Sequence, residues 1–147
     1  MNTRVNESNN DLSALAWVQE ELRKSLDTAH KALRRYLKEA EATSGSDVDA
    51  VDPAVLRTAR LHVHQGVGAL ELVNLSAGAT LLRASEAAVQ RFVAKPHKLD
   101  QAAVDVVERA SFALLDYITR LLAGKPVPAV ALYPQYQALQ TLAGAER

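Results

Sequence analysis

The sequence predicts an all-α fold, an antiparallel up-down four-helix bundle with a short extra helix at its C-terminal end. Three observations support this prediction. Ala and Leu supply 26 and 21 of the 147 residues, whereas aromatic residues make up only 5%, and this bias favours helices over a β-rich fold. Apolar residues recur at steps of three and four in four segments. Short connections join these segments, which is typical of antiparallel bundles.

Composition and charge exclude several classes of protein. Lys and Arg number 17 and Asp and Glu number 17, so the net charge is zero, whereas nucleic-acid partners normally require a basic excess. The absence of cysteine excludes disulfides and thiolate metal sites. No apolar run reaches the roughly 18–20 residues of a membrane span, and the polar opening MNTRVNESNN lacks the apolar core of a signal peptide. We therefore expect a cytoplasmic protein with no nucleic-acid partner and no membrane span.

The first helix of the bundle is predicted to be long. Residues 1–10 are polar and Asn-rich and are expected to form a disordered lead-in, so that the bundle covers residues 11–124. Asp11 or Ser13 can cap the first helix, which then meets no helix breaker before Ala42. Its apolar seam consists of Leu15, Val18, Leu22, Leu26, Ala29, Leu33, Tyr36 and Ala40.

The second helix follows a polar loop over residues 43–52. Asp52 is its predicted cap and Pro53 its first helical residue. Asn74 is expected to end it, since Asn tolerates the left-handed turn that closes many helices. The predicted buried stripe is Leu56, Ala59, Val63, Val67 and Leu70.

Two further helices complete the predicted bundle. Ser76 is expected to cap the third helix, which runs to Ala94 and stops before Pro96. The fourth begins near Asp100 and ends at Gly124. The remaining residues, 125–147, form a C-terminal extension. It is predicted to start with an extended proline-rich segment and to contain a short helix over Gln135–Ala143.

The least ordinary stretch is LHVHQGVGALELVNL, residues 61–75. It places two histidines and two glycines inside a predicted helix, where each glycine costs about 1 kcal/mol relative to alanine. This cost indicates close approach by another helix or by a docking partner. His64 and Gly68 are one turn apart and share a face. The predicted docking face around His64 consists of Arg57, Leu61, Gly68 and Leu72.

His64 is the candidate functional histidine. Imidazole titrates near neutral pH, and its nitrogen can accept a phosphoryl group; the simpler alternative is a packed or solvated histidine. His62 with Gly66 repeats the same spacing and remains the alternative acceptor. His62 and His64 point about 200° apart on a helix, so they cannot chelate one metal ion together. With no Glu-x-x-His pairs for a bundle metal site, we expect neither a metal nor a cofactor.

The stretch His64-Gln65-Gly66-Val67-Gly68-Ala69, followed by Asn74-Leu75, is similar to the signature of histidine phosphotransfer (Hpt) domains. That signature reads His, two residues, Lys, Gly and small residues, with a later Gly-Leu pair. The resemblance implies a four-helix bundle that carries a phosphoryl group on His64 between a kinase and a response-regulator receiver domain. Val67 takes the place of the signature lysine, and Asn74 that of the second glycine. Arg57, on the face of His64, is the candidate replacement for the missing positive charge.

The segments 15–24, 61–75, 108–117 and 130–136 resemble the N-terminal region of large CheA-like hybrid histidine kinases of the ChpA/PilL type, which control type IV pili and twitching motility. The implied partners are a receiver domain or other domains of the parent kinase. Related FimL-type domains imply a second function, a scaffold without phosphotransfer, which Val67 favours. No catalytic constellation of its own is visible in the chain.

A basic stretch on the predicted first helix has two interpretations. Six cations lie within it, with Asp27 as the acidic residue among them. A solvated helix face is the simpler interpretation, and a docking surface for an acidic partner is the functional one. The cations are Arg23, Lys24, Lys31, Arg34, Arg35 and Lys38.

Overall fold

In the computed structural model, residues 2–43 and 51–144 are described, and all of their regular secondary structure is helical. The predicted all-α class is therefore confirmed. Five α-helices are joined by short connections, two of which contain 3₁₀ turns. The elements are α1 Asn2–Ala42, α2 Ala54–Leu72, α3 Ser76–Ala94, η2 Pro96–Lys98, α4 Gln101–Leu122, η3 Ala129–Leu132 and α5 Tyr133–Leu142.

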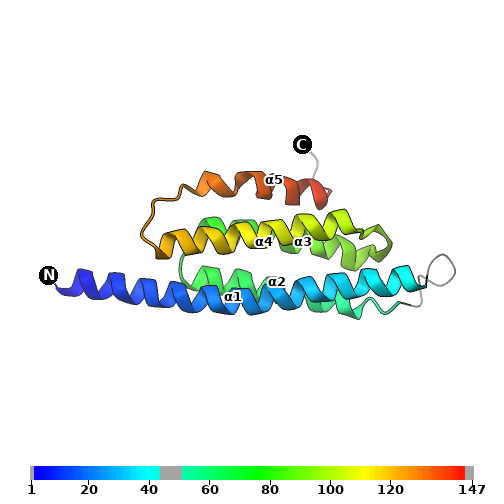
Figure 1. Ribbon diagram of the computed structural model, residues 1–147, viewed down its shortest axis with the longest axis horizontal. Coiled ribbons are helices and arrows are strands. Elements are labelled where there is room, and N and C mark those ends of the chain that lie inside the picture. The colour runs from blue at the N-terminus through cyan, green and yellow to red at the C-terminus, as the bar shows by residue number, and fades with distance from the viewer. Residues whose placement is uncertain (1, 44–50, 145–147) are drawn as a thin grey trace.

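The first four helices lie lengthwise beside one another, and successive helices run in opposite directions (Figure 1). Helix α1 packs against α2 and α4, and α3 packs against α2 and α4. Helix α5 lies on the outside along α3 and α4. Helix α2 therefore has α1 and α3 as its main neighbours, and its remaining face is open to solvent.

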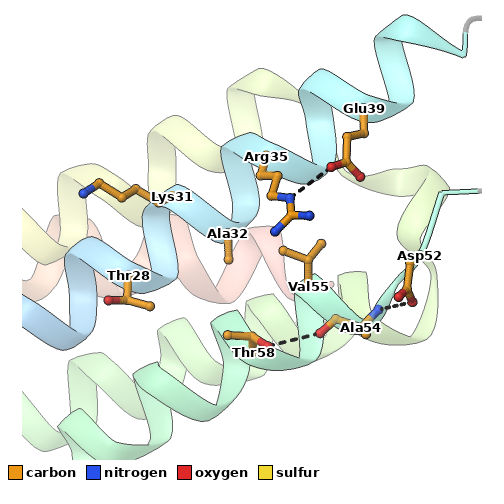
Figure 2. Close-up of a pocket in the computed structure, with 9 residues that line it drawn as sticks. All are labelled: Thr28, Lys31, Ala32, Arg35, Glu39, Asp52, Ala54, Val55 and Thr58. Carbon is orange, nitrogen blue, oxygen red and sulfur yellow. Dashed lines mark hydrogen bonds and ion pairs between the residues drawn. The ribbon is translucent and has the colours of Figure 1, made fainter.

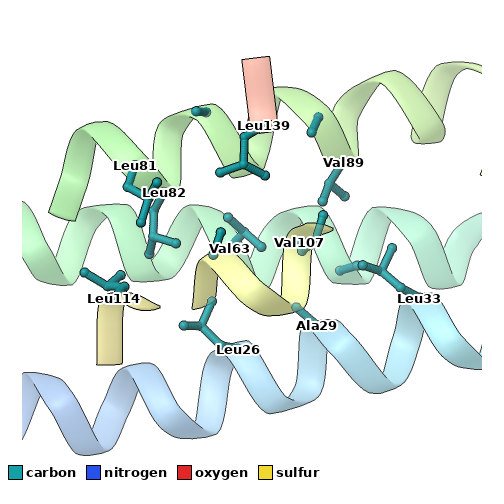
Figure 3. Packing of buried hydrophobic residues seen from close by; sticks show 14 of the residues in the cluster. Leu26, Ala29, Leu33, Val63, Leu81, Leu82, Val89, Val107, Leu114 and Leu139 are labelled. Carbon is teal, nitrogen blue, oxygen red and sulfur yellow. The ribbon is translucent and has the colours of Figure 1, made fainter. Parts of the chain in front are cut away.

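The core is built from one apolar stripe of each helix. Figure 3 shows Leu33, Val63, Val89 and Val107 converging from α1, α2, α3 and α4, with Leu139 of α5 adding a cover. Every residue of the stripe predicted for α2 is buried. Because a fully buried Leu or Val contributes about 1.5–3 kcal/mol, this shared core dominates the stability of the fold and fixes the rotation of α2.

Local signals set several helix boundaries close to where the sequence predicts them. Asn74 adopts a left-handed φ of 59° after α2, and Gly124 has a φ of 75° after α4. The Asp100 carboxylate accepts a hydrogen bond of 2.8 Å from the backbone N–H of Ala103 and so caps α4, near the start that the sequence predicts. Helix α3 ends at Ala94, directly before Lys95-Pro96.

Other boundaries differ from the prediction. Helix α1 begins at Asn2, so that the backbone of residues 2–10 continues the helix where a disordered lead-in is expected. No Gly or Pro interrupts this stretch, and extending a helix costs less than nucleating one. The predicted Ser76 cap is wrong: Ser76 is the first residue of α3, and Leu75 takes the cap position without a side-chain hydrogen bond.

The start of α2 and the C-terminal segment are also shifted. Helix α2 begins one residue later than predicted, with Pro53 at the cap position, although Asp52 does accept a hydrogen bond of 2.9 Å from the Ala54 N–H. The segment predicted to be extended contains η3, and α5 starts at Tyr133, two residues before its predicted start. Pro134 lies in the first turn of α5, where its missing N–H costs nothing.

No helix among the described residues combines the length and the apolar character needed to cross a membrane.

Candidate functional site

The open face of α2 carries the residues that the sequence singles out. Arg57, Leu61, His64, Gly68 and Leu72 are all exposed, and at 100° per residue they lie within an arc of about 80°. Leu72 retains 79% of its accessible surface and Leu61 47%. The core stripe lies on the other side of the helix, and burial of that stripe is what turns these five residues toward solvent.

His64 is held by a carboxylate from the neighbouring helix. Its Nδ1 atom lies 3.0 Å from Oε1 and 3.1 Å from Oε2 of Glu86 on α3. An ionised carboxylate can only accept hydrogen bonds, so we assign the proton to Nδ1, which donates to Glu86. In the neutral ring this leaves the lone pair on Nε2. The His64 side chain is 62% exposed, against 20% for Glu86.

A second side chain of α2 binds the same carboxylate. Nη1 of Arg60 donates a hydrogen bond of 3.0 Å to Oε2 of Glu86. Arg60 lies one turn before His64, so the two α2 side chains hold Glu86 from adjacent positions. Arg57, the arginine favoured from the sequence, forms no ion pair with any residue that the structure describes. Arg60 is therefore the cation that belongs to this site.

The structure also explains why no lysine stands at position 67. Val67 is only 4% exposed and belongs to the buried stripe. An ammonium group at this position would have to be desolvated or to reach around the helix, at a considerable cost in free energy. Positive charge near His64 therefore comes from the preceding turn of α2.

The two glycines of α2 have different roles. A Cβ atom added at Gly66 would lie 2.9 Å from Cδ1 of Leu82 and 3.0 Å from Cδ2 of Leu22. Gly66 is thus explained by close packing of α1 and α3 on α2. A Cβ atom at Gly68 would meet nothing within 4 Å. The packing among the described residues therefore gives no reason for Gly68.

His62 lies on a different face of α2, as the spacing predicts. Its ring is partly buried, and its Nδ1 atom is buried without a hydrogen-bond partner among the described residues. His62 is therefore less accessible than His64, and Glu86 forms no hydrogen bond with its Nδ1 atom. Across residues 2–43 and 51–144, no three or more His, Asp or Glu side chains gather so as to hold a metal ion.

The basic stretch of α1 is largely neutralised by its own neighbours. A groove of about 430 Å³ between α1 and α2 includes Lys31 and Arg35 in its lining (Figure 2). Lys31 lies 2.9 Å from Asp27, and Arg35 lies 3.0 Å from Glu39. Exposed pairs of this kind contribute little to stability, but they balance the charge of the surface. This arrangement supports the solvated-face interpretation.

A third histidine, His30, is buried between α1 and α4. Only 4% of it is exposed, and its Nε2 atom lies 2.8 Å from Oγ of Ser111. Because the Ser111 hydroxyl donates to the carbonyl of Val107, we assign the proton of the His30–Ser111 bond to Nε2. Burial, reinforced by the charge of Arg34 and opposed by Asp27, lowers the pKa of His30 to about 4. His30 is thus neutral near pH 7.

Glu86 is the site residue that the sequence pattern did not reveal. A helical hairpin brings together residues at similar distances from its turn, and this rule could have found it. His64 lies ten positions before Asn74 and Glu86 twelve positions after it. Gly66 and Leu82 meet across the same hairpin.

Comparison of the chain with family models, with curated proteins and with solved structures found no match.

Proposed function

We propose that the chain is an Hpt-like signalling domain, an antiparallel four-helix bundle in which His64 accepts a phosphoryl group. The observation that carries this proposal is the exposed His64 ring, held through Nδ1 by Glu86 so that Nε2 keeps its lone pair. The resemblance to CheA-like hybrid histidine kinases of the ChpA/PilL type extends the proposal to a cytoplasmic phosphorelay that acts on type IV pili and twitching motility.

The chemistry follows from the two ring nitrogens. The Nε2 lone pair attacks the phosphorus atom of an aspartyl phosphate on a receiver domain, or of ATP bound to a kinase domain. The bond from phosphorus to the carboxylate or to ADP breaks as the bond to Nε2 forms. The ring becomes positively charged, and Glu86 stabilises that charge through the Nδ1–H bond. The chain supplies the nucleophile, and its partner supplies the other catalytic groups.

The surroundings of His64 suit a receiver domain as the partner. Receiver active sites are acidic, and Arg60 brings positive charge to the site through Glu86, with the exposed Arg57 two turns before His64 on the same face. Leu61 and Leu72 offer exposed apolar surface on the same face, which a docked partner would remove from water. Gly68 leaves room for the partner's backbone one turn from the ring.

A FimL-like scaffold without phosphotransfer is the second candidate. It is favoured by Val67, which is buried where the Hpt signature has a lysine. In that case the same face of α2 binds its partner, and His64 contributes a contact rather than a nucleophile.

Transfer of labelled phosphate separates the two functions. The chain is mixed with a phosphorylated receiver, or with the core of a CheA-like kinase and ATP, and acid-labile label is measured. We expect label on the wild type and on His62→Gln, and none on His64→Gln, because His64, unlike the partly buried His62, is exposed and has a carboxylate on Nδ1. An established Hpt domain serves as the positive control. Absence of label on the wild type, with a labelled control, would favour the scaffold.

A further inference from the structure

Glu86 forms an ion pair with Arg60 as well as its hydrogen bond with His64. Glu86 is on α3, and its side chain could place either carboxylate oxygen toward α2 or rotate into water. Two α2 side chains instead hold it from adjacent turns, with Arg60 on Oε2 and His64 on both oxygens. A carboxylate held by two donors has fewer orientations available than one held by a single donor.

Charge is the second reason to consider Arg60. Glu86 places a full negative charge beside the ring that is to receive a dianionic phosphoryl group. The guanidinium of Arg60, which is always protonated, compensates this charge at 3.0 Å. Val67 has no charged group and is buried in the core, and Arg57 forms no ion pair with any residue that the structure describes.

We infer that Arg60 is a positioning residue: it fixes the Glu86 carboxylate against Nδ1 of His64 and supplies the positive charge that is missing because Val67 replaces the signature lysine. The cation thus lies one turn before the histidine instead of one turn after it. The inference rests on the proposed function only where it concerns phosphoryl transfer. The effect of Arg60 on the His64 tautomer does not depend on that function.

The chain contains a matched control for this inference. Arg83 and Glu71 form a second ion pair between α3 and α2, with Nη2 of Arg83 2.7 Å from Oε2 of Glu71. It links the same two helices, yet His64 forms no hydrogen bond with either residue. Arg83→Gln therefore removes an equivalent helix-to-helix pair without affecting the carboxylate on His64.

The experiment measures the His64 tautomer by side-chain proton–nitrogen NMR in mildly alkaline solution, on the full chain. We expect Nδ1–H to dominate in the wild type, in Arg60→Lys and in Arg83→Gln. In Arg60→Gln the population of the Nδ1–H tautomer should fall toward the population found in Glu86→Gln. An unchanged tautomer in Arg60→Gln would overturn the inference and leave Arg60 as one member of a surface ion pair.

Transfer from a phosphorylated receiver gives the second readout. We expect an initial rate about tenfold lower in Arg60→Gln, as for loss of one hydrogen bond to a charged group, with most of the rate retained in Arg60→Lys and Arg83→Gln. If the tautomer changes as expected but the wild type takes up no phosphate, the positioning by Arg60 stands and the proposed function fails. If the wild type is labelled and Arg60→Gln matches it in both readouts, the function stands and the inference fails.

Discussion

Acidification from about pH 6.5 to about pH 4 is expected to remove about 3 kcal/mol of stability through His30 alone. The pKa of this buried imidazole is about 4 in the folded chain, against about 6.5 in the unfolded chain. Between these two pKa values His30 is protonated in the unfolded state but not in the folded state, so the free energy of unfolding rises with pH. The contribution is complete above pH 6.5, and it declines as the pH falls toward the folded pKa.

Urea unfolding at a series of pH values measures this effect, and His30→Gln provides the reference. Glutamine keeps a side-chain N–H for Ser111 but cannot be protonated. The difference between wild type and variant should therefore vary with pH between 4 and 6.5 and be flat above it. The hydrogen bond from Lys31 lowers the pKa of Asp27 below its ordinary value, so the contribution of Asp27 is lost only at still lower pH. Parallel pH profiles of wild type and variant would contradict a buried neutral His30.

Valine placed at the two glycines of α2 should have opposite consequences. Gly66→Val is expected to destabilise the fold by about 1–3 kcal/mol, because its side chain overlaps Leu22 and Leu82 in a packed core. Gly68→Val should change stability by no more than about 0.5 kcal/mol, since its side chain enters open solvent. Denaturant midpoints measure both changes.

The effects on phosphoryl transfer should have the reverse order, with the larger direct effect from Gly68→Val. A branched side chain at Gly68 stands one turn from His64 on the docking face, so Gly68→Val should slow phosphoryl transfer while leaving the fold intact. Equal transfer by Gly68→Val and wild type would mean that no partner approaches α2 at this position. Equal destabilisation by the two variants would contradict the packing of Gly66 between α1 and α3.

The sequence predicted the features that depend on neighbouring residues. The ends of α2 and α4 follow from Asn74 and Gly124, which tolerate a left-handed φ, and the start of α4 follows from the side chain of Asp100. The core stripe of α2 follows from helical periodicity. Each of these signals acts within a few positions of the residue that carries it.

The features that the sequence did not reveal depend on packing between helices. Glu86 meets His64 only because α2 and α3 pack in one particular register, and periodicity within each helix does not set that register. The sequence pattern indicates Arg57 because it shares the angular position of His64, whereas in the structure Arg60 is the arginine that contacts Glu86 of α3. The two glycines look alike in sequence, and only the packed neighbours distinguish Gly66 from Gly68.

We propose that Nε2 of His64 carries the phosphoryl group. Phosphorus–nitrogen coupling in the NMR spectrum of the phosphorylated, isotope-labelled chain identifies the nitrogen that is modified. Because Glu86 occupies Nδ1, coupling is expected at Nε2 of His64 and at no nitrogen of His62. Modification at Nδ1 of His64, modification of His62, or no phosphohistidine under conditions that phosphorylate an established Hpt domain would contradict the claim.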